Sequence, residues 1–578
     1  MDLYLTLMKH FNKLGKLLAW ANNQRVVFAI FVLLISLPNF VLFFTEPLPL
    51  LTKVCNIVLP FSIFWYLFTL AKKPGKMFWI LFLFIFFDAF QIVLLYLFGN
   101  SVIAVDMFLN VVTSNSGEIE ELLGNLIPAL VIVFGLYGSG IALAIKSCLN
   151  KRTLDKEFLH RQRRYSYFGM GAGAVLLLLS FAFTKGFAFD CDIYPVNVSY
   201  NLYLAVDREI SNKHYFETSK NFKFGASSVH DKNEKEIYVL VIGETARADN
   251  FGIYGYGRNT TPNLSTEPNL VAYRDALSES NTTHKSVPMI MSAISAECFG
   301  KIYEQKGIVT AYKEAGYYTI FISNQRPNHS FIDFFGEEAD YSEFVKEKLP
   351  LEANVYDKEM LPRLSAQLKN CKAQKVFVVL HMYGSHFNYK ERYPEGDAYF
   401  KPDTAMAAHF KNREMLVNAY DNTIRYTDSF LKELITMLQG LDEPAAVVYT
   451  SDHGEDIFDD DRKLFLHASP VPSCYQIHVP LMFWASDSYI EKNQKQWQNI
   501  VANKDKAVST NKVIFHTLLD ISGVNTAYKV DSISLANSKF KESKRWYLND
   551  HNDAKSLDEV GMGSYDKAMF DSNGIKYP

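Results

Sequence analysis

Five long apolar runs occupy the first third of the chain, and a mixed pattern follows them. The runs are Val26–Phe44, Val54–Ala71, Met77–Phe98, Leu126–Ile145 and Tyr167–Thr184. Each has the length that a helix needs to cross the hydrocarbon core of a bilayer, about 17 to 25 residues. Because unpaired backbone groups are costly in lipid, all five runs are predicted to be helices. We therefore expect an α-helical membrane domain of five transmembrane helices at residues 1–189.

The connections between these runs differ in charge. One set carries only Lys53 together with the acids Asp106, Glu118, Glu120 and Glu121. The opposite set carries Lys9, Lys13, Lys16, Arg25, Lys72, Lys73, Lys76, Lys146, Lys151, Arg152, Lys156, Arg161, Arg163 and Arg164. Cations in short connections are retained on the cytoplasmic side. The pattern thus predicts a cytoplasmic amino terminus, with everything after residue 190 on the far side of the membrane.

From residue 236 onwards, short apolar strands alternate with amphipathic segments. The predicted strands are Glu236–Gly243, Tyr317–Ser323, Val376–His381, Ala445–Thr450 and Val479–Trp484, and the clearest helical segments are Ala405–Leu438 and Lys512–Ile521. This alternation is typical of a mostly parallel sheet flanked by helices on both faces. We expect an α/β domain at residues 236–578. Residues 190–235 show no strong period and are predicted to be a linker.

Length, charge and cysteine content narrow the class of protein. The chain has 578 residues, enough for two or more folding units, and its net charge is −3. Without a basic footprint, nucleic-acid binding is not expected. No two of the six cysteines have the C-x-x-C spacing of a metal site. If exported, Cys191, Cys298, Cys371 and Cys474 could form two disulfides, by any of three pairings.

Unusual polar residues follow the predicted strands, where ligands of open α/β sheets gather. Glu244 follows the first strand, Asp452 and His453 follow another, and His381 and His386 end a third. The stretch from Asn324 to His329 follows a fourth. Carboxylates and imidazoles that meet at one edge of a sheet suit a divalent metal such as zinc or manganese. A single Asp-His pair is common by chance, so the conjunction carries the prediction.

Two hydroxyls are candidates for a nucleophile at that metal. Thr282 and Thr283 precede a helical run with Pro288 early in it, so they are expected near a helix amino end, where partial positive charge favours an alkoxide. The alternative is that these threonines only cap the helix. His386 and His467 stand out among the fourteen histidines by their neighbours. They could hold phosphate oxygens, protonate a leaving group or bind a second metal.

Taken together, these motifs resemble the phosphoethanolamine transferases of Gram-negative bacteria, which modify lipid A and include the colistin (polymyxin) resistance enzymes. The resemblance runs from the five-helix part through VIGETARADNFGIYGYGRNTTPNL and THKSVP to SDHGE and the later LH. It implies an alkaline phosphatase/sulfatase-like α/β domain in the periplasm, anchored in the bacterial inner membrane. It also implies transfer of phosphoethanolamine from phosphatidylethanolamine to lipid A or another envelope acceptor, with release of diacylglycerol.

The resemblance also implies roles for individual residues. Glu244, Thr283, Asp452 and His453 would bind one catalytic zinc, with a second metal or manganese left open. Thr283 would be the nucleophile that becomes modified, because it stands five residues before Pro288. His386 and His467 match the histidines that bind phosphate or a second metal. Asn324 and His329 fall where relatives contact the donor headgroup.

One feature departs from that family. Relatives that modify lipid A commonly bracket the nucleophile segment with a disulfide, and here Met289 and Glu279 stand at its two positions. The nucleophile loop is therefore expected to be held by packing, and the acceptor stays open.

Three other functions share part of this pattern. Phosphoglycerol transfer to an envelope glycan or polymer is the closest alternative, because it shares the helix count and the metal-threonine chemistry. A sulfatase is less favoured, because THKSVP lacks a C/S-x-P-x-R segment. A non-catalytic receptor or transporter would not use the metal-site motifs, and Asp88 is the only acid within the five runs.

Overall fold

A computed structural model describes residues 20–46, 48–98, 102–113, 127–350, 353–405 and 408–577. The chain divides into two compact units, one of residues up to 108 and 123–205, the other of residues 109–122 and 206–578. Several charged residues used in the orientation argument lie outside the described residues, namely Lys9, Lys13, Lys16, Glu118, Glu120 and Glu121. The predicted run that starts at Leu126 and the segment that starts at Ala405 each include residues outside them.

The first unit is helical. Its elements, some of which run on into the second unit, are α2 (Gln24–Ile35), α3 (Leu37–Thr45), α4 (Leu50–Phe68), α5 (Pro74–Ile80), α6 (Phe82–Phe98), α7 (Val105–Thr113), the π-helical turn η1 (Phe134–Gly138), α9 (Ser139–Leu149), α10 (Lys156–Phe183), α11 (Phe189–Asp192) and α12 (Val196–Thr218). Among the described residues, four helical stretches are long and apolar enough to cross a membrane: Gln24–Thr45, Leu50–Phe68, Ile127–Leu149 and Lys156–Phe183. The third predicted span is instead the pair α5 and α6, which bends by 73°. The prediction of five spans holds if that bent pair is one span.

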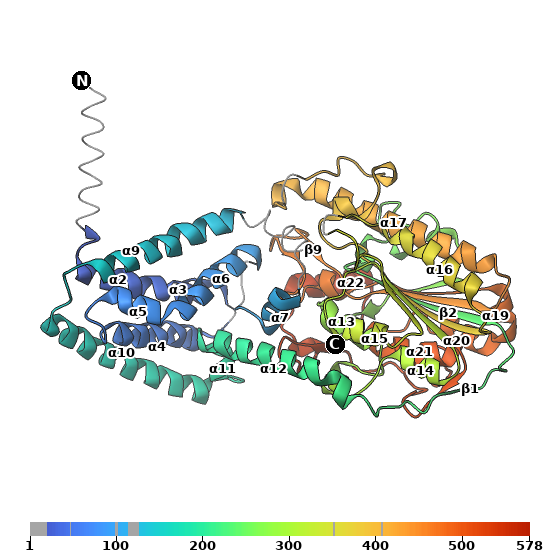
Figure 1. Ribbon diagram of the computed structural model, residues 1–578, viewed down its shortest axis with the longest axis horizontal. Helices are drawn as coiled ribbons and strands as arrows, with labels where there is room; N and C mark the ends of the chain where they lie inside the picture. The colour runs from blue at the N-terminus through green and yellow to red at the C-terminus, as the bar shows by residue number, and fades with distance from the viewer. Residues whose placement is uncertain are drawn as a thin grey trace, which may run out of the picture. The chain divides into compact units, whose positions relative to one another are not determined.

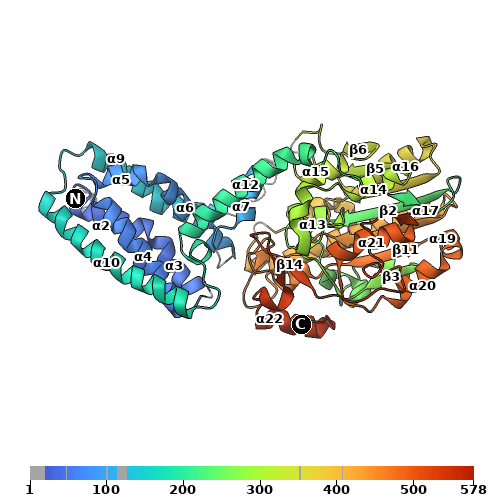
Figure 2. The ribbon, with the colours of Figure 1, turned by 90° about the horizontal axis from the view of Figure 1, so that it is seen from below.

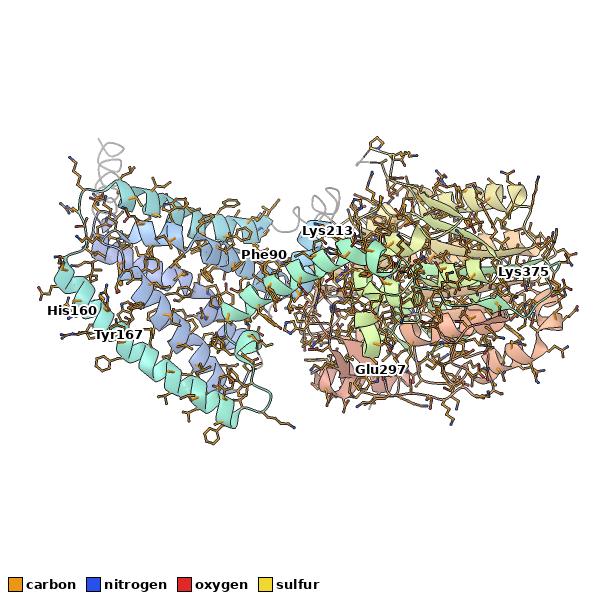
Figure 3. The ribbon with its side chains drawn as sticks, turned by 60° about the horizontal axis from the view of Figure 1, so that its bottom comes forward. Phe90, His160, Tyr167, Lys213, Glu297 and Lys375 are labelled. Carbon is orange, nitrogen blue, oxygen red and sulfur yellow. The ribbon has the colours of Figure 1, made fainter. Side chains whose placement is uncertain are left out.

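Large apolar side chains on these helices are exposed. Phe168 and Phe183 of α10 are 79% and 78% exposed, and Phe134 of η1 is 71% exposed. His160 of α10 is also exposed and points away from the other helices (Figure 3), whereas the ring of Tyr167 lies 5.5 Å from that of Tyr66 in α4. Such a surface is unfavourable in water and suited to lipid. The region is therefore a helical membrane domain.

The second unit is built on a seven-stranded sheet in the order β3-β11-β8-β2-β7-β5-β6, seen from below in Figure 2. The strands are β2 (Glu236–Gly243), β3 (Leu270–Tyr273), β5 (Tyr318–Ser323), β6 (Tyr341–Phe344), β7 (Lys375–His381), β8 (Ala445–Ser451) and β11 (Leu481–Ala485). From β8 to β6 all neighbours are parallel, whereas β11 is antiparallel to both β8 and β3. The sheet is thus mostly parallel, as the sequence predicts.

Helices cover both faces of this sheet. Successive residues of β2 alternate between two cores, with Tyr238 and Leu240 in one and Ile237 and Val239 in the other. The first core is covered by α13 (Thr283–Ile290), α14 (Ile308–Glu314), α15 (Phe331–Gly336) and α21 (Thr510–Ile521), and the second by α16 (Met360–Asn370) and α17 (Arg413–Gln439) (Figure 1). A strand buried on both faces needs apolar residues at every position, which explains the unbroken apolar run of β2.

Smaller elements complete the unit. They are α18 (Cys474–Ile477), α19 (Asp487–Lys492), α20 (Gln494–Ala502), α22 (Ser564–Asn573) and the strand pairs β1 (Ser227–Ser228) with β13 (Val524–Asn525), β4 (Ala276–Leu277) with β12 (Val508–Ser509), β9 (Asp456–Ile457) with β10 (Phe465–Leu466), and β14 (Trp546–Leu548) with β15 (Ala554–Ser556).

All five predicted strands appear in the sheet, and two short strands, β3 and β6, were not predicted. The segment predicted as a linker, residues 190–235, contains α12 over 23 residues. Cys298, Cys371 and Cys474 are free thiols, so neither of the two disulfides that the sequence allowed is formed.

Candidate active site

Three candidate metal ligands lie together beyond the carboxyl ends of β2 and β8. Glu244 directly follows β2, and Asp452 and His453 directly follow β8. These strands are parallel neighbours, so the residues after them meet at one edge of the sheet. One ligand atom from each of the three lies within 4.8 Å of the others. All three side chains are buried.

Backbone groups fix two of these side chains. Asp452 Oδ1 accepts hydrogen bonds from the backbone N–H of Thr245 at 3.0 Å and of His453 at 2.7 Å. His453 Nδ1–H donates to the carbonyl of Gly454 at 2.8 Å, so the lone pair of Nε2 points into the site. Burial lowers the pKa of His453 to about 3, which keeps its ring neutral.

The three side chains turn atoms with lone pairs toward one another. His453 Nε2 lies 3.2 Å from Asp452 Oδ2 and 3.5 Å from Glu244 Oε1. Asp452 Oδ2 is buried and accepts no hydrogen bond from the described residues. Burial, with repulsion by Asp452, raises the pKa of Glu244 to about 7, and burial raises that of Asp452 to about 6. A divalent cation offsets this repulsion, so two carboxylates and one imidazole fit zinc or manganese.

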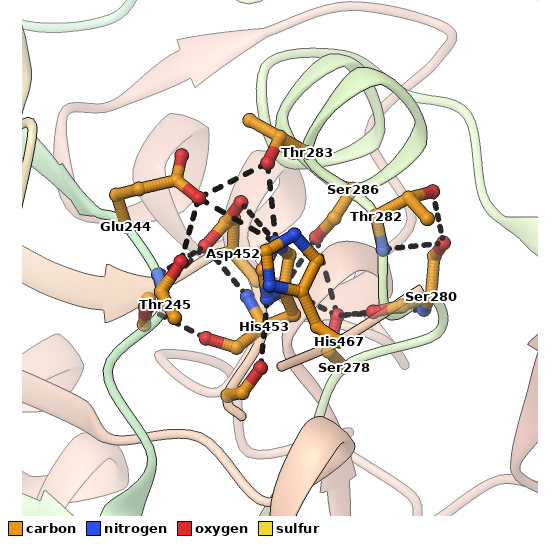
Figure 4. Close-up of polar contacts among 12 residues, drawn as sticks. Glu244, Thr245, Ser278, Ser280, Thr282, Thr283, Ser286, Asp452, His453 and His467 are labelled. Carbon is orange, nitrogen blue, oxygen red and sulfur yellow. Dashed lines mark hydrogen bonds and ion pairs between the residues drawn. The ribbon is translucent and has the colours of Figure 1, made fainter. Parts of the chain in front are cut away.

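Thr283 is the first residue of α13 and joins this cluster. Its Oγ1 donates to Glu244 Oε1 at 3.1 Å and lies 3.1 Å from His453 Nε2. Thr282 is the N-cap residue, but it makes no side-chain capping bond, and its hydroxyl lies 3.2 Å from Ser280 Oγ. Figure 4 shows Thr283 pointing at Glu244 and His453, while Thr282 points away. The geometry favours the nucleophile interpretation of Thr283 over helix capping.

His467 lies beside the cluster and is held by a carboxylate that was not among the predicted site residues. Its ring centroid is 4.2 Å from that of His453, and its Nδ1–H donates to Glu455 Oε2 at 3.1 Å. Burial lowers the pKa of His467, but the bond to Glu455 outweighs this and the net shift is upward. Glu455 also accepts from the Tyr389 hydroxyl. The glutamate stands in the SDHGE motif, and that position was the one available signal for it.

His386 differs from His467 in charge. Its Nδ1–H donates to the carbonyl of Phe387 at 2.6 Å, and its ring stacks on Tyr383 with centroids 5.1 Å apart. Burial and the positive charge of Arg392 lower its pKa well below the usual range. His386 is therefore a neutral ring with an available Nε2 lone pair.

The residues of the segment after β5 differ in burial and in their contacts with the metal cluster. Asn324 Nδ2 donates to Asp357 Oδ1 at 2.8 Å, and its buried Oδ1 accepts no hydrogen bond from the described residues. His329 is exposed, with φ at +58°. Gln325, which was not predicted, reaches the metal ligands: its Nε2 donates to Glu244 Oε2 at 3.1 Å and to the Met382 carbonyl at 2.9 Å. No sequence signal separates Gln325 from its neighbours.

Hydrogen bonds hold the loop that leads to Thr283, in addition to the packing that the sequence predicts. Glu279 is buried, and its Oε2 accepts from the backbone N–H of Ala296 at 2.7 Å. Its own backbone N–H donates to Asn511 Oδ1 at 2.7 Å. Met289 does pack fully into the core. A carboxylate can replace a covalent link here because backbone donors are within its reach.

The chain is similar to known proteins in sequence and structure. A family model described as Sulfatase matches residues 236–524. Kdo(2)-lipid A phosphoethanolamine 7''-transferase of Escherichia coli strain K12 is 29% identical over 326 residues, which are 55% of this chain and 56% of that protein. The chain thus spans little more than half the length of the curated relatives it matches.

Two solved structures support the fold. The periplasmic domain of EptC from Escherichia coli in complex with Zn has a TM-score of 0.53 at 25% identity, covering 59% of this chain and 97% of that one. Lipooligosaccharide phosphoethanolamine transferase A from Neisseria meningitidis, an integral membrane protein, has a TM-score of 0.70 at 21% identity, covering 88% and 97%. The second likeness spans both units and supports the fold alone.

Proposed function

The chain belongs to the sulfatase family, and from that premise we propose that it is a metal-dependent phosphoethanolamine transferase. The donor would be phosphatidylethanolamine, and the acceptor lipid A or another envelope component. One observation carries the proposal: the Thr283 hydroxyl contacts both Glu244 and His453 within a buried cluster of metal-type ligands. The names of the relatives support phosphoethanolamine as the transferred group.

Glu244, Asp452, His453 and Thr283 are the residues that would hold a zinc ion. A zinc ion supplies Lewis-acid chemistry, lowering the pKa of a neighbouring hydroxyl and offsetting charge on phosphate oxygens. The hydroxyl proton of Thr283 leaves along its hydrogen bond to Glu244 Oε1. The start of α13 adds partial positive charge beside the oxygen that becomes negative.

In the first step, Thr283 Oγ1 attacks the phosphorus of the donor. The Oγ1–P bond forms, and the bond from phosphorus to the glycerol oxygen breaks. The glycerol oxygen takes a proton and leaves as diacylglycerol, while phosphoethanolamine stays on Thr283. In the second step an acceptor oxygen attacks the same phosphorus, and Thr283 leaves and regains its proton.

The two histidines suit different tasks in these steps. His467 pairs with Glu455 and has a raised pKa, so its Nε2–H can donate to a phosphate oxygen or to the leaving oxygen. His386 is neutral because burial and Arg392 lower its pKa, so its Nε2 lone pair can bind a second metal.

The segment after β5 would contact the donor headgroup. Asn324 Oδ1 is buried without a donor among the described residues, so it can accept from an ammonium group. The exposed imidazole of His329 is open to a ligand.

The membrane domain would bring the site to lipid substrates in the bacterial inner membrane. The distribution of lysine and arginine supports a cytoplasmic amino terminus and a periplasmic α/β domain. A reporter that is active only when exported, fused after residue 578, tests this orientation; an inactive fusion would overturn it.

Mass spectrometry of lipid A from cells with and without the gene tests the proposed reaction. We expect an added phosphoethanolamine with the unaltered gene and with Thr282→Ala, and none with Thr283→Ala. Equal loss in both variants would reject Thr283 as the nucleophile. A phosphoglycerol adduct on an envelope glycan or polymer would instead favour the alternative donor.

A further inference from the structure

A cavity lies outside the cluster of candidate metal ligands. Its volume is about 640 Å³, and its lining includes Arg247, Arg258, Arg274 and Arg413. None of the four candidate metal-binding residues lines it. A volume of this size is within the range of small-molecule sites.

Positive charge exceeds negative charge around this cavity. Asp459 is shared, because it accepts from Arg247 at 2.7 Å and from Arg413 at 3.4 Å. Arg258 pairs with Asp421 at 2.8 Å.

The other lining acid, Asp249, lies 2.9 Å from His478 Nδ1 and also accepts a hydrogen bond from Asn573 Nδ2. Arg274 is exposed, and its guanidinium has no ion pair or side-chain hydrogen bond among the described residues. The cavity lining thus holds four guanidinium groups and two carboxylates, and Arg274 is the one of the four without a carboxylate partner among the described residues.

The arginines come from separate parts of the chain. Arg274 follows β3, Arg413 begins α17, and Arg247 and Arg258 flank the turns after β2. A guanidinium is a planar fork of donors that matches a phosphate. Arg274 has this fork free of any carboxylate partner among the described residues, and the other three arginines add positive charge around it. Tyr254 and Tyr475 add aromatic walls.

A single layer of residues separates this cavity from the metal centre. A side chain at Gly454 would collide with Tyr475 and with Arg247, both of which line the cavity. Gly454 follows His453 directly. Arg247 Nη1 also donates to the carbonyl of Glu455 at 2.9 Å, the residue that holds His467. Arg247 therefore lines the cavity and also contacts the residues that surround the candidate metal site.

We propose that this cavity is a binding site for a phosphate-bearing ligand, distinct from the metal centre where transfer would occur. Arg274 would pair with the phosphate group of the ligand. Arg247 lies between the cavity and Glu455, the residue that holds His467 beside the metal cluster. The inference does not depend on phosphoethanolamine being the transferred group.

Calorimetric titration of the full chain in phosphatidylcholine nanodiscs with glucose 6-phosphate tests the site. We expect saturable binding, unchanged after dialysis against a chelator, since the cavity needs no metal. Loss of one charged hydrogen-bonding partner should weaken binding about tenfold in Arg274→Ala, and further in Arg274→Glu. Arg413→Ala is a second variant from another element. Lys495→Ala, an exposed cation on α20, which contributes no cavity residue, is the matched control and should bind normally.

The source of the phosphate is distinguished by adding phosphatidylglycerol to the nanodiscs. Competition that depends on Arg274 would assign the site to a lipid headgroup, and its absence to a soluble phosphate. The proposal is overturned if no saturable binding occurs in either membrane, if chelation abolishes binding, or if the Arg274 variants bind like the Lys495 control. Zinc content should not change in any of these variants.

Discussion

Two groups of predicted functional residues lie at the carboxyl edge of the same sheet, one after β2 and β8 and the other after β5, and they are built differently. Beyond β2 and β8, Asp452 and His453 are fixed by hydrogen bonds to the backbone, and all the ligand-type atoms converge. Beyond β5, Asn324 turns toward Asp357, and His329 is exposed. The first arrangement is rigid before any ligand arrives, whereas the second leaves groups open to a ligand. A rigid site suits chemistry, and an open one suits recognition of a headgroup.

The strongest test of this contrast is Asp452→Asn. The change keeps the shape of the side chain but removes charge at the buried Oδ2, so zinc content after dialysis should fall, and transfer should drop at least about a hundredfold. Elemental analysis and a transfer assay measure the two effects. Asp442→Asn, at an exposed position with φ of +53° that asparagine tolerates, is the control. Normal zinc content in Asp452→Asn would show that the cluster is not the metal site.

Gln325→Leu probes a residue that follows β5 and contacts a candidate metal ligand that follows β2. Without its bond to Glu244 Oε2, zinc affinity should fall about tenfold, as for partners that orient a metal ligand. Competition with a chromogenic chelator gives the affinity. If the variant binds zinc as tightly as the parent protein, the segment after β5 makes no contribution to the metal site.

His329→Gly tests the segment after β5 and should change transfer less than Gln325→Leu does. Glycine accepts the positive φ, so folding is preserved. Because the proposed contact of His329 would be with the donor headgroup and not with the reacting atoms, KM for the donor should rise about threefold at constant kcat. A fall in kcat with KM unchanged would move His329 from recognition to chemistry.

Glu279→Gln should alter stability and leave transfer within about twofold. Burial raises the pKa of Glu279 to about 7 from its ordinary 4.5, so between these values the folded chain holds a proton that the unfolded chain has lost. The free energy of unfolding therefore falls as pH rises from about 4.5 to 7 and stays low above that. Glutamine carries no charge to bury, so the free energy of unfolding of the variant should exceed that of the parent by roughly 1–3 kcal/mol at pH 8 and by almost nothing at pH 4. Thermal unfolding at both pH values measures the difference, and an equal offset at both would contradict it.

The parts of the fold that a local pattern specifies could be predicted from the sequence. The long apolar runs and the strand β2 can be recognised in the sequence because nearly every position in them is apolar. The strands β3 and β6 have four residues each and gain their stability from neighbours in the sheet, so no local signal marks them. The bend of 73° between α5 and α6 was not predicted either, because the run from Met77 to Phe98 is continuously apolar apart from Asp88 and Gln91.

The candidate site was predictable to a similar extent. Glu244, Asp452 and His453 could be grouped because each follows a strand, and the structure brings them together. Gln325 and Glu455 could not, since their roles depend on where a side chain points after folding. The same reason hid the hydrogen bonds of Glu279, which add to the packing of Met289 that the sequence suggested.

The two backbone donors to Asp452 Oδ1 have a consequence for evolution. A ligand held by amide N–H groups keeps its place whatever side chains those residues carry, provided that the chain keeps its path. Thr245 supplies one of these donors from a backbone with φ of +60°, where most side chains are strained. Side-chain substitutions around Asp452 should therefore leave the position of its carboxylate unchanged. Substitutions that alter the backbone conformation at Thr245 should displace it. The lineage is expected to be free to diversify around the metal centre without rebuilding it.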